Sequence, residues 1–181
     1  MFAVIGLGNP EPPYAGTRHN AGASTVSVFQ QLVGAPELQL QKKSQTSVSK
    51  TSQIVIGKPA TYMNESGQAV RAVLDYYQIE PENLYLIFDD LDLELGQHKI
   101  QFATGPKVHN GLLSVYQHLG TQNFWHVRIG VDSRGADRRI NPSEYVLQRF
   151  LTDEQSLFKQ TQVRVADELK QRLLATPGTL K

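Results

Sequence analysis

The sequence contains no cysteine among its 181 residues. This absence excludes disulfide bonds, a thiol nucleophile and cysteine-ligated zinc. The sequence also lacks any apolar run near the roughly 18 residues that a transmembrane helix needs. Its first residues have neither the basic region nor the apolar region of a signal peptide. We therefore expect a cytoplasmic protein that does not enter a membrane.

The net charge of the chain is also small, at only +1 near neutral pH. A protein that coats nucleic acid non-specifically usually has a larger positive charge. The charges are unevenly distributed, however. Residues 75–94 carry seven acidic residues and no Lys or Arg, whereas residues 128–149 carry five arginines and three acidic residues. We therefore expect that one part of the surface can still contact a polyanion.

The apolar patterns predict strands that alternate with helices. Short apolar or β-branched runs predict strands at residues 2–6, 53–57, 83–88, 98–102 and 126–131. Helical spacing of apolar residues predicts helices over 23–33, 66–77, 112–119 and 157–173, with Thr152 and Gln155 as a capping box before the last one. We expect a single α/β domain over residues 1–181, with a mixed, mostly parallel twisted sheet flanked by helices.

The stretch GLGNPEPPYAGTRHNAG, residues 6–22, follows the first predicted strand and suggests a dinucleotide-binding loop. That fingerprint needs a third glycine, and Glu11 stands in its place. Pro10, Pro12 and Pro13 also disfavour the helix that should follow immediately. We therefore reject an NAD site. A generic nucleotide binder stays as a weaker alternative, which a thermal shift with nucleotides would test.

Metal-binding patterns are not complete in this sequence. None of the five histidines belongs to an HExxH motif. The run FDDLDLELG places Asp90, Asp92 and Glu94 at alternate positions, as in an EF-hand loop. Leu95 and Gln101 occupy the positions where that loop needs glycine and a bidentate glutamate. We interpret these three acidic residues as a solvated turn and predict no metal site.

Two polar residues directly follow predicted strands. Asp89 directly follows the run LYLIF, and Asn9 lies at the end of the first strand. Open α/β sheets bind ligands at the carboxyl ends of their strands, so both side chains are expected near a site. The residues alone leave His19 open between a structural and a functional role, and His109 is interpreted as structural.

Three further asparagines, Asn20, Asn64 and Asn110, precede predicted helices. Helix capping is the favoured interpretation of each one taken alone. The alternative is that these amides bind a neutral ligand and polarise a carbonyl group, because an amide offers a donor and an acceptor without charge.

Six separated motifs are similar, in order and spacing, to the bacterial peptidyl-tRNA hydrolases. They are GLGNPEPPYAGTRHNAG, KPATYMNESGQAV, LIFDDLDLELG, VHNGLLSV, RIGV and EYVLQRF, and they extend over nearly the whole chain. The resemblance implies an enzyme that hydrolyses the ester joining a peptide to the terminal ribose of tRNA. It further implies a monomer that acts on peptidyl-tRNA without a metal, a cofactor or an obligate protein partner.

The resemblance also implies roles for individual residues. His19 corresponds to the family's general base, which activates water, and Asp89 corresponds to the carboxylate that orients it. Substrate binding near the ester is implied for Asn9, Tyr14, Met63, Asn64 and Asn110.

Lys99 and Arg128 correspond to a basic pair that holds the 5′-phosphate of the tRNA. Without the resemblance, each is equally well interpreted as a solvent-facing base on a strand.

The sequence departs from the family pattern near three of these motifs. Lys107 and Val108 replace a pair of glycines before His109, and the loss predicts a stiffer loop with strain at Val108. Phe88 replaces a histidine, and Gln101 replaces a second basic residue. Because such departures can alter turnover, a non-catalytic RNA-binding relative of the same fold is the alternative function.

Overall fold

A computed structural model describes residues 1–106, 108–135 and 140–174. These residues form a seven-stranded sheet with the strand order β2-β3-β4-β1-β5-β7-β6. The strands are β1 (Phe2–Gly6), β2 (Gln39–Gln41), β3 (Thr46–Lys50), β4 (Ile54–Pro59), β5 (Leu84–Glu94), β6 (His98–Phe102) and β7 (Trp125–Asp132).

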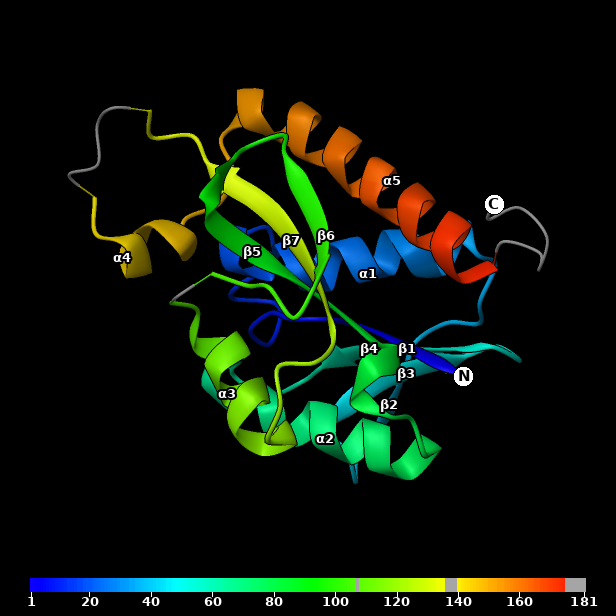
Figure 1. The fold of residues 1–181 in the computed structure, drawn as a ribbon. Helices are drawn as coiled ribbons and strands as arrows, with labels where there is room; N and C mark the ends of the chain where they lie inside the picture. The colour runs from blue at the N-terminus through cyan, green and yellow to red at the C-terminus, as the bar shows by residue number, and fades with distance from the viewer. Residues whose placement is uncertain (107, 136–139, 175–181) are drawn as a thin grey trace.

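Helices cover both faces of this sheet (Figure 1). They are α1 (Ala21–Leu32), α2 (Ser66–Tyr77), α3 (Asn110–Leu119), α4 (Pro142–Val146) and α5 (Thr152–Leu174). Three 3-10 turns, η1 (Arg18–Asn20), η2 (Met63–Glu65) and η3 (Pro81–Asn83), lie between these elements. None of the helices in the described ranges is long and apolar enough to cross a membrane.

The centre of the sheet is parallel and its margins are antiparallel. Strands β4, β1, β5 and β7 pair in parallel, whereas β2, β3 and β6 join through antiparallel pairs. The expected α/β fold with a mixed sheet is therefore confirmed. The parallel strands β1, β4 and β5 contain continuous apolar runs, because helices bury both of their faces.

Alternate residues of the central strands face two separate hydrophobic clusters. Val4 and Ile87 pack with α1 and α5, whereas Ile5 and Leu86 pack with α2 and α3 on the opposite face. Figure 1 shows the same arrangement, with α1 and α5 on one side of the sheet and α2 and α3 on the other. The strands are thus fixed from both sides, and their carboxyl ends provide a rigid edge.

Strand β5 is longer than the prediction of residues 83–88, because it continues through the acidic run to Glu94. Its register with β7 shifts between Asp90 and Glu94, where it passes Gly130. A Cβ atom at Gly130 would lie 2.1 Å from the carbonyl oxygen of Glu94, so only glycine permits this approach. The predicted turn is wrong, because Asp90, Asp92 and Glu94 all lie in β5. Asp90 is also buried, whereas Asp92 and Glu94 are solvated as predicted.

The start of α5 differs from the predicted capping box. The carboxylate of Glu154 accepts a hydrogen bond from the backbone N–H of Leu151 at 2.7 Å, while Gln155 Nε2 donates to the carbonyl of Phe150 at 3.3 Å. Only one half of a capping box is therefore present: Glu154 accepts from the backbone of Leu151, one residue before Thr152, and leucine has no hydroxyl to return the bond.

Candidate active site

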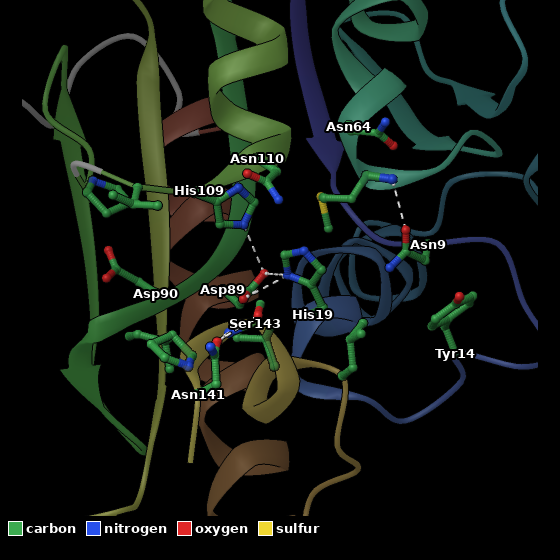
Figure 2. A pocket seen from close by; sticks show the side chains of 17 residues that line it. Asn9, Tyr14, His19, Asn64, Asp89, Asp90, His109, Asn110, Asn141 and Ser143 are labelled. Carbon is green, nitrogen blue, oxygen red and sulfur yellow. Dashed lines mark hydrogen bonds and ion pairs between the residues drawn. The ribbon is translucent and has the colours of Figure 1, made fainter. Parts of the chain in front are cut away.

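A cleft of about 610 Å³ opens at the carboxyl ends of β1 and β5, a volume typical of ligand sites. Four segments supply most of its wall: the loop after β1, η2, the start of α3, and the segment around α4 (Figure 2). The lining residues are Asn9, Tyr14, His19, Met63, Asn64, Asp89, Asp90, Leu91, Pro106, Val108, His109, Asn110, Asn141, Pro142, Ser143, Val146 and Leu147. All seven residues predicted for catalysis or substrate binding lie in this cleft.

His19 and Asp89 form a direct pair. His19 sits in the turn η1, and its Nδ1 atom lies 2.9 Å from Oδ1 and 3.0 Å from Oδ2 of Asp89 on β5. The close approach of the two segments depends on Gly22, where a Cβ atom would lie 2.2 Å from the carbonyl oxygen of Ile87. Because Nδ1 is bonded to the carboxylate, Nε2 is the ring nitrogen that remains for a substrate or water.

The pair changes the protonation of both groups. Burial lowers the pKa of His19, but the charge of Asp89 and its hydrogen bond outweigh burial and raise that pKa above 6.5. Burial likewise raises the pKa of Asp89, but the electrostatic attraction of the His19 and His109 rings and their hydrogen bonds hold it well below its usual range. Asp89 is therefore an anion at neutral pH, and the His19 ring accepts a proton readily.

His109 belongs to this site, although we interpreted it as structural. It is the N-cap of α3, where its Nδ1 atom accepts a hydrogen bond from the backbone N–H of Leu112 at 3.1 Å. The proton of the neutral ring is then on Nε2, which donates to Oδ1 of Asp89 at 3.0 Å. The repeated His-Asn motif was the available signal, but it does not reveal which carboxylate the ring meets.

Asn9 is held by bonds on both its backbone and its side chain. Its Oδ1 atom accepts from the backbone N–H of Met63 at 2.8 Å, which connects the β1 loop to η2. Its backbone N–H donates to Asn20 Oδ1 at 2.9 Å, and Asn20 Nδ2 donates back to its carbonyl at 3.0 Å. The capping interpretation of Asn20 is therefore wrong, because its side chain makes no cap bond to α1.

Asn64 and Asn110 are exposed on the cleft (Figure 2). Asn64 lies in η2, and Asn110 is the first residue of α3, whose cap is His109. Capping is thus the wrong interpretation for Asn110 and also for Asn64, since Glu65 occupies the N-cap position of α2. Tyr14 forms another part of the wall, where its ring packs edge-on against Tyr62 at 6.4 Å.

Lys99 and Arg128 are direct partners across β6 and β7, outside the residues that line the cleft. Lys99 is exposed, whereas Arg128 is buried. Its Nε atom donates to Asp90 Oδ2 at 2.6 Å, and one terminal nitrogen donates to Gln101 Oε1 at 3.0 Å. The predicted solvent-facing alternative is therefore wrong for Arg128.

The loop before α3 shows a further difference. Val108 is 81% exposed at the cleft, and its predicted backbone strain stays a prediction. Ala103, earlier in the same loop, has a positive φ of 51°. Lys107 lies outside the described residues, as do Arg138 and Arg139 of the basic stretch. Phe88 is fully buried, and its ring lies 5.2 Å from that of His109.

Three residues of the site could hold a metal ion. The ligand atoms of His19, Asp89 and His109 lie within 4.8 Å of one another, and two imidazoles with a carboxylate suit Zn²⁺. In this structure both rings already share hydrogen bonds with the carboxylate.

Comparison with known proteins gives one consistent result. The sequence profile described as peptidyl-tRNA hydrolase matches residues 3–178. The peptidyl-tRNA hydrolase of Corynebacterium efficiens is 38% identical over 84% of this chain and 84% of its own. That of Synechococcus elongatus is 38% identical over 87% of this chain and 79% of its own. The crystal structure of peptidyl-tRNA hydrolase from Acinetobacter baumannii superposes with a TM-score of 0.86 at 32% identity, covering 96% of this chain and 89% of that one.

Proposed function

The chain belongs to the peptidyl-tRNA hydrolase family, and from this premise we propose that His19 is the general base of its reaction. The protein is an enzyme that hydrolyses the ester bond of peptidyl-tRNA and releases free tRNA and peptide. The observation that supports the role of His19 is its bond to Asp89, which leaves Nε2 toward the cleft.

In the proposed mechanism, Nε2 of His19 removes a proton from a water molecule as the water oxygen attacks the ester carbonyl. The negative charge of Asp89 stabilises the imidazolium ion that results. When the tetrahedral intermediate collapses, the bond to the ribose oxygen breaks. The imidazolium then returns its proton to that oxygen, which regenerates the neutral ring. The step needs no further reactant, because water supplies both the hydroxyl group and the proton.

We propose that the cleft asparagines bind the reacting group. Asn9 uses its Oδ1 atom to hold Met63, so its Nδ2 group is the part that can donate to a carbonyl. Asn64 and Asn110 present exposed amides from η2 and α3. Donors fixed on three separate elements can stabilise an oxyanion and hold the peptide backbone. Tyr14 and Met63 complete the wall.

For the tRNA, we propose that Lys99 supplies the exposed charge that contacts the 5′-phosphate, with Arg128 beside it. Such a contact positions the substrate without reading its sequence. Since the guanidinium of Arg128 is bonded to Asp90 and Gln101, its contribution to phosphate binding is expected to be smaller than that of Lys99. We further propose a cytoplasmic, single-domain monomer that works without an obligate protein partner.

The test is hydrolysis of N-acetyl-aminoacyl-tRNA by the purified chain, at two salt concentrations. We expect turnover that is lost in His19→Ala and that weakens with salt, because binding releases counterions. His118→Ala is the matched control, since His118 bonds the carbonyl of Ser114 in its own helix. Near-normal turnover by His19→Ala would remove His19 as the base. Binding of tRNA without any turnover in the unaltered chain would favour the non-catalytic relative.

A further inference from the structure

Arg18 is a buried arginine directly before His19 and is only 2% exposed. Its guanidinium donates to Glu154 Oε2 at 2.6 Å and to the carbonyl of Arg149 at 2.8 Å. It also lies over the ring of Tyr145, 4.2 Å from its centroid. Ion pairs of this kind are costly to bury unless hydrogen bonds satisfy them. Here both terminal nitrogens of Arg18 donate hydrogen bonds, and only its Nε atom has no partner among the described residues.

Glu154 extends these contacts on the far side of the ion pair. It accepts hydrogen bonds from the backbone N–H of Leu151 and from the hydroxyl of Ser133. The same Ser133 hydroxyl lies 2.7 Å from the hydroxyl of Tyr145. The Arg18 side chain is therefore enclosed by groups from the end of β7, from α4 and from the start of α5.

The backbone beside Arg18 is joined to the same region. The N–H of Arg18 donates to the carbonyl of Gln148 at 3.0 Å, and Thr17 forms an isolated antiparallel bridge with Arg149. Residues 141–147 continue from this region into the cleft, where Asn141 and Ser143 form part of the wall (Figure 2). One buried side chain thus connects the turn that carries His19 to the α4 wall of the cleft.

We propose that Arg18 is a positioning residue that fixes His19 against Asp89 and holds the α4 wall in place across the cleft. This inference rests on the proposed role of His19 as base. Arginine is required because its planar guanidinium group donates to a carboxylate and a carbonyl at the same time and also stacks on an aromatic ring. Lysine at this position retains the charge but has a single ammonium group and no planar surface.

The test compares Arg18→Lys with Arg134→Lys. Arg134 is a close match, because it forms a buried ion pair with Asp132 and lies 4.7 Å from the centroid of the same Tyr145 ring. It differs from Arg18 because, within the described residues, it makes no hydrogen bond to the turn that carries His19. Both variants are measured at saturating substrate, together with His19→Ala, after circular dichroism and thermal unfolding show that they are folded.

We expect Arg18→Lys to lower kcat by about ten- to a hundredfold, the effect of a small displacement of a reacting group. An NMR titration should show the pKa of His19 falling toward 6.5 as its contact with Asp89 loosens. Arg134→Lys should leave both values near those of the unaltered chain. A purely structural role would lower the unfolding temperature of Arg18→Lys without moving the pKa of His19.

If Arg18→Lys does not fold, Glu154→Gln replaces it, because it removes the charge of the acid while the carbonyl and ring contacts of Arg18 persist. The same lowered kcat and lowered pKa of His19 are expected. A folded variant with normal kcat and a normal His19 titration would overturn the inference, while an inactive His19→Ala in the same experiment would leave the proposed function intact. An active His19→Ala would overturn both.

Discussion

Both carboxylate oxygens of Asp89 face Nδ1 of His19, at 2.9 and 3.0 Å, and one of them also meets His109 at 3.0 Å. Asp89 is 2% exposed, so this charge is stabilised by the two rings rather than by bulk water. The orientation of His19 therefore depends on a partner that is itself fixed within β5 and bonded to α3.

Asp89→Asn tests that dependence. The substitution removes the negative charge that stabilises the imidazolium, so kcat should fall by about 10²- to 10⁴-fold while KM changes little. Steady-state kinetics with N-acetyl-aminoacyl-tRNA would measure the two constants. Asp92→Asn is the control, because Asp92 is exposed on the same strand. A loss confined to KM would contradict the orienting role.

The central sheet was predictable because strands β1, β4 and β5 contain continuous apolar runs. Strands β2 and β3 were missed because QLQ and TSVSK are short and largely polar. The length of β5 was missed because the acidic run pairs with β7, a contact between segments far apart in the sequence.

The site was predictable to a similar extent. Asp89 and Asn9 followed from the edge of the sheet, and the resemblance supplied His19, Tyr14, Met63, Asn64 and Asn110. The wall around α4, which includes Asn141 and Ser143, was not predicted. Two relationships were not predictable: the bond from His109 to Asp89 and the ion pair of Arg128 with Asp90. Both depend on how distant segments pack, and no local spacing encodes that packing.

His109→Ala should lower both stability and turnover. The free energy of unfolding should fall by about 1–3 kcal/mol, because α3 loses its N-cap and Asp89 loses a donor. Turnover should fall less than in Asp89→Asn, since His19 keeps its partner. Urea denaturation and kcat measure the two effects, with the exposed Gln117→Ala as control. Unchanged stability together with unchanged kcat would show that neither bond of His109 matters.

Arg128→Ala and Lys99→Ala should differ sharply in stability. Loss of Arg128 leaves the buried Asp90 without its cation, which should cost about 3–5 kcal/mol. Loss of the exposed Lys99 should cost no more than about 0.5 kcal/mol but should raise KM for tRNA that carries a 5′-phosphate. Urea denaturation measures the first difference, and kinetics on phosphorylated and dephosphorylated tRNA measure the second. An equal rise in KM for both tRNAs would refute the phosphate contact.

Protonation of His126 should lower the free energy of unfolding as the pH falls. Burial lowers its pKa to about 4, and its Nδ1–H donates to the carbonyl of Phe124 while the Tyr116 hydroxyl donates to Nε2. Because the folded pKa lies below the unfolded value of 6.5, the unfolded chain binds the proton more strongly between these values. This residue alone then lowers the free energy of unfolding by at most about 1.4 kcal/mol per pH unit as the pH falls.

The double variant His126→Phe and Tyr116→Phe replaces both hydrogen-bonding partners with apolar rings. Urea denaturation at several pH values between 4 and 6.5 would compare its slope with that of the unaltered chain. The variant should show a shallower dependence on pH. Equal slopes would mean that His126 does not titrate in this range.

The most direct test of the account is the pH dependence of kcat/KM. Asp89 raises the pKa of His19 above 6.5, and only the neutral ring can accept a proton from water. Activity should therefore rise with pH through a midpoint above 6.5, and in Asp89→Asn the midpoint of the residual activity should move to lower pH. A midpoint that Asp89→Asn leaves unmoved, or that persists in His19→Ala, would contradict the pairing of His19 with Asp89 as the source of catalysis.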